Sequence, residues 1–484
     1  MRRLVPALLA ALLWPAVARA APTALAVVVG SNASPSPSQD PLHYADDDAI
    51  QNARTLTLLG TRPVLLVSPD AETRELFPGV RPDGRATQAQ VVAAFERLAV
   101  QARAAGGATR LYIFIAAHGD TEGGRAFLQL EDGRLWRDDL AALARRVNAA
   151  ETHVIIDACH ASLFVGSRGP GGDRTPLGAG FSRRAGGPAW PAHTGFLTAR
   201  SSGGQTHEWT EFQAGIFSHE VRSGLLGGAD LDLDGRVTYR ELGAFIGRAN
   251  QEIPNRKYRP QVMTAPPDGA LDTVLSTLPS GPPALELEID AASGGRAFIE
   301  SERGIRLADL HVAPGSPVRL RLPTDLGAVF LSRERPPAEY HLPAGPGRVL
   351  LSQLSPESPR ARPRGAAHEA FRRLYALPFD AAAVADFRAD VDLALEAEPP
   401  RSSLPRWAPW VPLAAGAAAL AVSGGLLVSS HQLRGGAGAG TDGVEIQRIN
   451  ARMATRNRAA IITGIAGDAL VLGGLALFYW QDRF

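Results

Sequence analysis

The chain has little cysteine and little net charge, and both absences narrow what it can be. Its 484 residues include a single cysteine, Cys159, so no intramolecular disulfide can form. The formal net charge is +1, and arginine greatly outnumbers lysine without forming a polybasic block, so nothing indicates a nucleic-acid partner. With 45% apolar and 20% charged residues the composition is that of a globular protein, and the length indicates two or three domains.

The N-terminus has the pattern of an export signal. Met1-Arg2-Arg3 is a basic start, 4–17 is an apolar core, and Ala18-Arg19-Ala20 fits a small-x-small cleavage site. Residues 1–20 are therefore predicted to be a cleaved signal peptide, which places the following domains outside the cytoplasm. An uncleaved anchor is the weaker alternative because the apolar core is short for a membrane span.

Two apolar stretches near the C-terminus predict a membrane anchor. Residues 410–429 and 460–480 are each about 20 residues long, enough to cross a bilayer, so 407–481 is predicted to be a two-helix transmembrane hairpin. The connection between the stretches is expected to be a basic loop, carrying Arg434, Arg448, Arg452, Arg456 and Arg458 against Asp442 and Glu445. Basic loops stay cytoplasmic. The chain is therefore predicted to lie in the cell membrane with its main domain on the non-cytoplasmic side.

Between residues 23 and 265, short apolar runs alternate with segments of helical periodicity. This pattern predicts an α/β domain with a mainly parallel sheet. The expected strands are 25–29, 63–66, 111–115, 153–156 and 195–198. The expected helices are 47–59, 88–105 and 137–149.

Two of the expected strands deliver reactive side chains to one edge of the sheet. The first is followed by Ala116-Ala117-His118-Gly119, and the second by Asp157-Ala158-Cys159-His160. Because functional groups collect at the carboxyl ends of parallel strands, His118 and Cys159 are expected to lie together. A thiol becomes a strong nucleophile when a nearby base removes its proton. The alternative is a buried cysteine that only fills space.

With these motifs the chain resembles the caspase-like cysteine peptidases, which include caspases, metacaspases and paracaspases, over a domain at 21–268. The resemblance implies a caspase-like, mainly parallel sheet flanked by helices, with His118 as base and Cys159 as nucleophile. It also implies an oxyanion hole formed by the backbone N–H groups of Gly119 and Cys159. The substrate would be a protein or peptide, the chemistry would need no cofactor, and a homo-oligomer is compatible with this assignment.

Further segments support the resemblance, and one position departs from it. Residues 25–32 resemble the family's first strand and turn, 42–49 the start of its first helix, and 200–208 with 215–218 the small-subunit segment. Many relatives have Gly-His-Gly where this chain has Ala117 before the histidine. The departure motivates a second hypothesis, a catalytically silent scaffold that binds peptides or partner proteins at the membrane surface.

The resemblance also implies a substrate preference. Caspases have a glutamine two residues before the nucleophile, whereas this chain has Asp157, and Asp48 and Glu208 occupy segments similar to other parts of the specificity pocket. Metacaspase-like and paracaspase-like members have acidic residues there and cleave after arginine or lysine. Acidic groups favour a guanidinium through charge-assisted hydrogen bonds. We therefore expect cleavage after basic residues and no cation beside Asp157. A carboxylate that only caps local backbone is the alternative.

A Gly/Pro/Arg-rich segment at 166–193 has no apolar periodicity. By the resemblance it lies between the large-subunit and small-subunit regions, where many members are cut during activation. An Arg-directed enzyme could cut there after Arg168, Arg174, Arg183 or Arg184. A flexible surface excursion is the alternative.

Residues 230–241 match the twelve-residue EF-hand calcium loop, with a glycine at position 6 and an apolar residue at position 8. The predicted ligands are Asp230, Asp232, Asp234, Glu241 and the backbone carbonyl of Arg236. Helices are expected on both sides, at 216–226 and 239–250. The predicted Ca²⁺ would be structural or regulatory, and its affinity weak because EF-hands usually pair. The alternative is an acidic turn that serves capping and solubility.

The composition changes after Pro266. Five strand-like runs predict a small β-sandwich accessory domain at 282–354, with strands at 285–289, 296–299, 317–322, 328–331 and 348–351. Residues 355–406 are expected to form a helical linker, with helices at 366–375 and 381–396.

Overall fold

The structure is a computed structural model in which the chain divides into two compact units, residues 1–391 and 392–484. It describes residues 22–37, 39–123, 125–159, 161, 164, 190–200, 208–254, 259–281, 283–359, 373–388, 407–435 and 442–481. The predicted signal peptide and the four arginines of the 166–193 segment lie outside the described residues.

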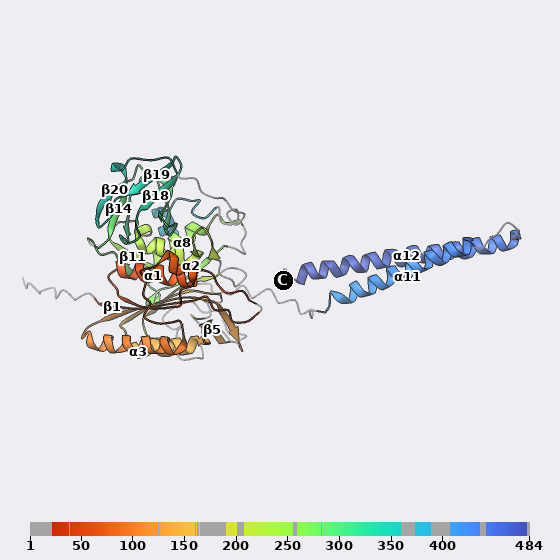
Figure 1. The fold of residues 1–484 in the computed structure, drawn as a ribbon, viewed down its shortest axis with the longest axis horizontal. Coiled ribbons are helices and arrows are strands. Elements are labelled where there is room, and N and C mark those ends of the chain that lie inside the picture. Colours follow the sequence, from red (N-terminus) through yellow and green to blue (C-terminus); the bar gives the residue numbers. More distant parts are fainter. Residues whose placement is uncertain are drawn as a thin grey trace, which may run out of the picture. The chain divides into compact units, whose positions relative to one another are not determined.

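A six-stranded sheet forms the centre of the first unit, in the order β12-β8-β7-β3-β1-β2 (Figure 1). Its strands are β1 (Thr23–Ser31), β2 (Pro63–Val67), β3 (Thr109–Ala117), β7 (Glu151–Asp157), β8 (Thr194–Arg200) and β12 (Gln261–Ala265). Every neighbouring pair is parallel except β12 with β8, which is antiparallel. Unbroken apolar runs such as Val27-Val28-Val29 are fully buried, as strands covered on both faces require. The mainly parallel α/β sheet expected from the sequence is confirmed.

Helices cover both faces of this sheet. In Figure 1, α1 lies above the sheet and α3 below it. The helices are α1 (Ala45–Leu58), α2 (Ala71–Leu76), α3 (Gln88–Ala104), α4 (Arg137–Val147), α7 (Ile216–Ser223) and α8 (Tyr239–Asn250). Their starts have identifiable causes: Thr87 caps α3, and Thr238 with Glu241 forms a capping box on α8. The helix expected at 216–226 instead changes at Ser223 into a π-helical turn, η1 (Gly224–Gly228).

Short elements surround this sheet. A three-stranded antiparallel sheet contains β4, β5 and β6, and two-stranded sheets join β9 with β10 and β11 with β13. These strands are β4 (Gly119–Glu122), β5 (Arg125–Gln129), β6 (Arg134–Trp136), β9 (Glu208–Trp209), β10 (Ala214–Gly215), β11 (Arg236–Thr238) and β13 (Val274–Thr277). Two 3-10 turns are η2 (Pro267–Gly269) and η3 (Leu351–Gln353).

A β-sandwich follows in the chain and lies beyond α1 and α8 in Figure 1. One sheet has the order β17-β14-β20 and the other β16-β15-β18-β19. The strands are β14 (Leu285–Ile289), β15 (Gly295–Ser301), β16 (Arg306–Val312), β17 (Val318–Leu322), β18 (Val329–Glu334), β19 (Pro337–Leu342) and β20 (Gly347–Leu350). One buried apolar cluster extends from Ala26 in the central sheet to Leu331 in this sandwich, so the two parts share a core.

The two helices expected in the linker differ from the prediction where the structure describes them, at residues 373–375 and 381–388. Residues 373–375 form a turn, in which Tyr375 has a φ of 53° and donates its backbone N–H to Ala249, so the helix expected at 366–375 does not extend to its predicted end. The helix expected at 381–396 is α10 (Ala381–Asp386), and it stops because Phe387 is extended. Phe387 packs against the apolar core, which favours this early end.

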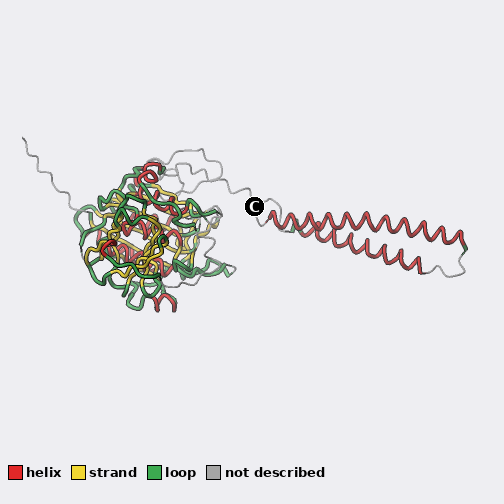
Figure 2. Tube along the Cα trace, turned by 90° about the horizontal axis from the view of Figure 1, so that it is seen from above, coloured by secondary structure: helices red, strands yellow, loops and turns green. Residues whose placement is uncertain are grey.

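The second unit contains two long helices, α11 (Trp410–Gly435) and α12 (Gly443–Gln481), which lie side by side as a hairpin (Figure 2). Both are long and apolar enough to cross a membrane. Gly416 and Gly467 approach each other closely, and Ser423 donates a hydrogen bond of 2.7 Å to the carbonyl of Ala460. The prediction that these arginines lie in a loop is wrong, because Arg434 belongs to α11 and the arginines from 448 to 458 belong to the first half of α12.

Candidate active site

The parallel pairing of β3 and β7 brings the two reactive motifs together. Ala116 is paired with Asp157, and His118 and Cys159 each lie two residues further along. A Cβ atom added to Gly119 would overlap the carbonyl oxygen of Cys159, so the two strand ends are in contact. His118 is buried, with 7% of its surface exposed, and Cys159 is half-buried. The expectation that these residues share one edge of the sheet therefore has a geometric basis.

Two residues of the 33–43 segment hold the ring of His118. Its Nε2 atom lies 2.9 Å from the carbonyl oxygen of Asp40, and its Nδ1 atom lies 2.8 Å from the side-chain nitrogen of Gln39. A carbonyl oxygen only accepts, so the ring proton is assigned to Nε2, and Nδ1 then accepts from the Gln39 amide. Nδ1 is therefore the nitrogen with base character.

The environment of His118 favours its neutral form. Burial lowers the pKa of this histidine, and the hydrogen bond to the Asp40 carbonyl opposes that shift only in part. A neutral imidazole with a lone pair on Nδ1 can remove a proton from a thiol. Gln39 and Asp40 were missed at the level of sequence because their Pro/Ser-rich surroundings show no periodicity or motif.

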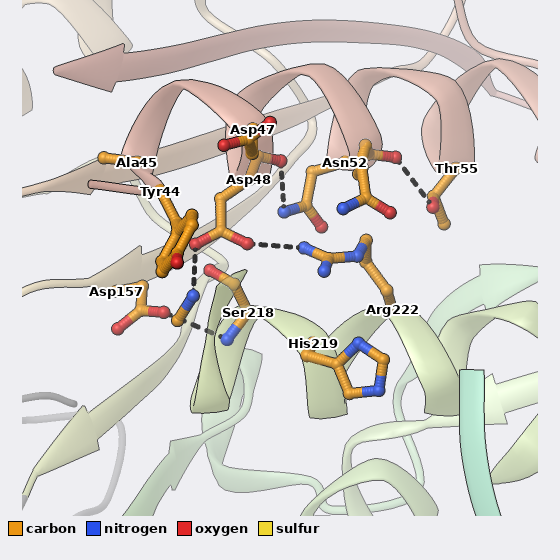
Figure 3. Close-up of polar contacts among 12 residues, drawn as sticks. Tyr44, Ala45, Asp47, Asp48, Asn52, Thr55, Asp157, Ser218, His219 and Arg222 are labelled. Carbon is orange, nitrogen blue, oxygen red and sulfur yellow. Dashed lines mark hydrogen bonds and ion pairs between the residues drawn. The ribbon is translucent and has the colours of Figure 1, made fainter. Parts of the chain in front are cut away.

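Asp157 and Asp48 both lie close to Gly215, and Figure 3 shows the two carboxylates beside Ser218 and Arg222 of α7. Asp157 accepts a hydrogen bond of 3.0 Å from the N–H of Ser218, and Asp48 accepts one of 2.8 Å from the N–H of Gly215. A side chain at Gly215 would overlap Asp157 and crowd Asp48, so only glycine fits there. Two of the three predicted pocket carboxylates are thus brought together. Asp157 also caps local backbone, so that alternative holds as well.

The expectation of no cation in this acidic group is wrong. Arg222, on α7, donates a hydrogen bond of 2.7 Å to Asp48, and both side chains are buried. Burial, together with the charge of the neighbouring Asp157, raises the pKa of Asp48 to about 7 despite the opposing Arg222 charge. Burial also raises the pKa of Asp157, opposed by Ser218 and Arg222. Arg222 was overlooked because a single arginine in an amphipathic helix is ordinarily a surface residue.

Glu208 lies at the start of α1 rather than deep among the other two carboxylates. It accepts hydrogen bonds from the backbone N–H groups of His43, at 3.0 and 3.1 Å, and of Tyr44, at 2.8 Å. Burial raises its pKa, these hydrogen bonds lower it, and the charge of Asp157 raises it. Glu208 therefore lies within electrostatic reach of Asp157. Residues 201–207, which lead to it, lie outside the described residues.

Three of the five predicted calcium ligands come together. One carboxylate oxygen from each of Asp230, Asp232 and Asp234 lies within 4.8 Å of the others. Glu241 caps α8 by accepting hydrogen bonds from Thr238, and Arg236 begins strand β11. The three aspartates thus form an acidic cluster, at a distance along the chain from His118 and Cys159, and calcium binding by this loop stays a prediction.

A second buried charge cluster escaped the sequence analysis. Asp309 of β16 accepts hydrogen bonds from Arg306, at 2.6 and 2.8 Å, and lies 2.9 Å from Nε2 of His219 on α7. The Arg306 guanidinium lies over the ring of Phe298. Because His219 and Arg222 belong to one helix, this cluster and the acidic group at Gly215 are joined by α7.

Comparisons with known proteins identify structural neighbours only. No protein-family model matches the chain, and no curated protein matches it. Among solved structures, caspase-1 from Spodoptera frugiperda is 14% identical, with 50% of this chain and 86% of that one covered and a TM-score of 0.30. The structure named pro-sf-caspase-1 is 13% identical, with the same coverage and TM-score. The resemblance to caspase-like peptidases therefore rests on the motifs at His118 and Cys159 and on the geometry that joins them.

Proposed function

We propose that this protein is a membrane-anchored, caspase-like cysteine endopeptidase that hydrolyses peptide bonds after arginine or lysine. The observation that carries the proposal is the contact between the ends of β3 and β7, where Gly119 packs on the backbone of Cys159 and a neutral histidine precedes it. A base and a thiol at adjacent carboxyl ends of parallel strands are the two groups that covalent acyl transfer needs.

In the proposed mechanism, Nδ1 of His118 accepts the thiol proton of Cys159, and the thiolate attacks the carbonyl carbon of the scissile bond. The backbone N–H groups of Gly119 and Cys159 stabilise the resulting oxyanion. The imidazolium returns its proton to the leaving amine, and water then hydrolyses the thioester. The backbone carbonyl of Asp40 orients the ring by accepting a hydrogen bond from Nε2–H. Because Gln39 donates to Nδ1, its side chain has to move before that nitrogen can accept the thiol proton.

The preference for basic residues is supported by the balance of charge. Asp48, Asp157 and Glu208 supply three carboxyl groups near Gly215 and the start of α1, and among the described residues the guanidinium bonded to one of them is that of Arg222. Arg222 is bound to Asp48, which leaves Asp157 and Glu208 to attract a substrate cation. An aspartate substrate would add a negative charge to this group at a Coulombic cost.

The proposed location is the outer face of the cell membrane. It rests on the predicted signal peptide and on α11 and α12, both long and apolar enough to span a bilayer. In this topology the hairpin tip is cytoplasmic, because the arginines that follow Glu445 favour that side.

The test uses full-length protein in detergent and fluorogenic peptides that differ only in arginine, lysine or aspartate before the scissile bond. We expect hydrolysis of the arginine and lysine peptides, no hydrolysis of the aspartate peptide, and loss of activity in Cys159→Ala. A thiol-directed affinity label should modify Cys159. Absence of both hydrolysis and labelling would overturn the peptidase proposal. Equal hydrolysis of arginine and aspartate peptides would overturn only the acidic pocket.

The silent scaffold remains the second candidate, and one observation favours it. Both ring nitrogens of His118 have partners in the 39–40 segment, so the base nitrogen is already occupied. A scaffold would keep its peptide or partner binding in Cys159→Ala, whereas a peptidase would lose its function in the same variant.

A further inference from the structure

Residues 230–241 form a folded acidic loop between η1 and α8. Leu233 and Gly235 have φ values of 60° and 77°, and these left-handed turns direct Asp230, Asp232 and Asp234 toward one point. Backbone N–H groups hold the carboxylates there: Gly235 donates to Asp230, Asp234 to Asp232, and Arg236 to Asp234, at 3.2, 3.1 and 2.8 Å. Three carboxylates are thereby held close together, and their mutual repulsion favours a cation at the point where they converge.

Asp230 provides a second, independent indication that this loop binds a cation. Only 3% of its surface is exposed, and its Oδ1 atom has no hydrogen-bond partner among the residues that the structure describes. A buried carboxylate oxygen without a partner costs free energy, so native proteins rarely keep one. Oδ2 of the same group already accepts from Gly235. A cation at the point where the three carboxylates converge would satisfy Oδ1.

Glu241 supplies a fourth carboxylate from the first turn of α8. Its Oε2 atom accepts hydrogen bonds from the N–H and the hydroxyl of Thr238, at 2.9 and 2.8 Å, which fixes the side chain on the loop side of the helix. This position, eleven residues after Asp230, is where an EF-hand loop has its bidentate ligand.

We propose that residues 230–241 bind one calcium ion through Asp230, Asp232, Asp234, Glu241 and the backbone carbonyl of Arg236. All five ligands are oxygens, which suits a hard cation, and the loop can adapt to the six to eight ligands that calcium takes at about 2.3–2.6 Å. Magnesium demands a stricter octahedron and should bind less tightly.

The site should be single and weak. In β11, Arg236–Thr238 pairs with β13, and the loop before β13 has Asp268 and Asp272 but not the spacing of an EF-hand loop, so this pairing couples no second EF-hand site. The guanidinium of Arg319 lies close enough to interact electrostatically with Asp230, and its positive charge opposes the binding of calcium there. We therefore expect a dissociation constant of about 10⁻⁴–10⁻³ M, the range of extracellular calcium modules.

The location links the ion to the candidate active site. Asp230 follows directly after α7 and η1, and α7 carries Ser218 and Arg222, the partners of Asp157 and Asp48. An ion that fixes Asp230 therefore fixes the C-terminal end of the segment that positions the acidic group. This consequence rests on the proposed function, whereas binding of the ion does not.

The test is isothermal titration of full-length protein in detergent with CaCl₂ and, separately, with MgCl₂. We expect one calcium per chain and weaker magnesium binding. Asp232→Asn, at an exposed position, should weaken calcium binding at least about tenfold without unfolding the protein, and Glu241→Gln should weaken it further. Glu96→Gln, an exposed carboxylate on α3, is the matched control and should leave binding unchanged.

A substitution that should tighten calcium binding makes the test more specific. Arg319→Gln removes the opposing charge and should tighten binding about two- to threefold. Arg348→Gln is its control, since both arginines are paired with Glu288 but only Arg319 acts on Asp230. The proposal is overturned if wild-type protein shows no calcium heat and no calcium-dependent rise in Tm at 10 mM, or if Asp232→Asn binds as tightly as wild type.

Discussion

Two buried aspartate–arginine pairs lie against helix α7, and they differ in how completely the charges are matched. Asp309 receives two hydrogen bonds from Arg306 and also lies 2.9 Å from His219, so its carboxylate is surrounded by donors. Asp48 receives one hydrogen bond from Arg222 and one from Gly215, and Asp157 is close by. Among the described residues, Nε and Nη2 of Arg222 have no hydrogen-bond partner.

The two aspartates therefore differ in how readily they bind a proton. The Arg306 charge and its hydrogen bonds hold the pKa of Asp309 well below its usual range, even though burial opposes this. For Asp48, burial raises the pKa by more than the Arg222 charge lowers it, and the pKa rises to about 7. The Asp309–Arg306 pair thus stays charged near neutral pH, and through His219 it connects α7 to the β-sandwich. A partly matched pair can change its charge near neutral pH, and it lies within the proposed specificity group.

Breaking the matched pair should have the largest effect. Asp309→Ala removes the two hydrogen bonds that Arg306 makes with Asp309 and leaves the buried guanidinium with Glu300 as its remaining carboxylate partner. We therefore expect a cost of about 3 kcal/mol in the free energy of unfolding, the low end for breaking a buried pair. Urea denaturation followed by tryptophan fluorescence measures this loss. The double variant Arg306→Met/Asp309→Leu removes both charges and should recover most of the stability. A loss below about 1 kcal/mol in Asp309→Ala would contradict the role assigned to this pair.

The pH dependence of stability should separate the two pairs. The pKa of Asp48 is about 7 in the folded chain against 3.8 in the unfolded chain, so wild-type stability falls as pH rises from 4 to 7. Asp48→Asn removes this pH dependence, so the stability of the variant relative to wild type should rise by about 2–3 kcal/mol as pH goes from 5 to 8. This change adds to a pH-independent cost of leaving the buried Arg222 without its carboxylate.

Asp309→Asn is the matched control for this comparison. The lowered pKa of Asp309 stabilises the fold above the unfolded pKa, and that stabilisation is lost only as pH falls through the lower folded value. Its difference from wild type should therefore stay constant from pH 5 to 8. Denaturation midpoints at four pH values measure both differences. Parallel curves for wild type and Asp48→Asn would show that Asp48 keeps an ordinary pKa.

Glu208 extends the comparison to a carboxylate held by backbone N–H groups alone. Because no arginine is bonded to it in the described structure, its charge is available to a substrate cation. Under the proposed function, Glu208→Gln should lower kcat/KM for arginine peptides about tenfold, equivalent to about 1.4 kcal/mol, with little change for a neutral peptide. Equal losses for both peptides would indicate a structural role at the start of α1.

The smallest effect is expected for a pair on the surface. Arg54 of α1 and Asp325 form the same kind of ion pair, but 70% of the Asp325 side chain is exposed. Asp325→Ala should cost no more than about 0.5 kcal/mol, and less in high salt. Urea midpoints at low and high ionic strength measure this. A loss as large as that of Asp309→Ala would show that burial does not control the strength of these pairs.

The five parallel strands of the central sheet were predictable from sequence because they are buried on both faces, whereas the antiparallel edge strand β12 was not predicted. Each of the five parallel strands contains an unbroken apolar run, and the expected ranges agree with the observed ones to within a few residues. Strands β16 and β19 were missed for the opposite reason. In β16, Arg306 and Asp309 interrupt the apolar pattern, and their mutual pairing inside the protein is what makes the strand possible. In β19, a proline begins the strand.

The residues of the candidate site also differ in whether the sequence could place them. His118 and Cys159 could be placed together because they follow adjacent parallel strands, and strand order alone determines that edge. Arg222, Gln39 and Asp40 could not, because each reaches the site through contacts far along the chain. The Gln39–His118 contact spans 79 residues and the Arg222–Asp48 contact 174. Such contacts depend on how helices and loops pack, which local patterns do not specify.

The length of α12 has a consequence for the attachment of the protein. Its 39 residues correspond to about 58 Å, whereas the bilayer core is about 30 Å thick. If the apolar part from Ala460 spans the core, residues 443–459 extend about 25 Å beyond it as a rigid rod. Arg448, Arg452 and Arg456 recur every four residues along one side of that rod. Each arginine near anionic headgroups adds about 1 kcal/mol of attraction, so lipid composition would determine whether the rod stands upright or lies along the membrane.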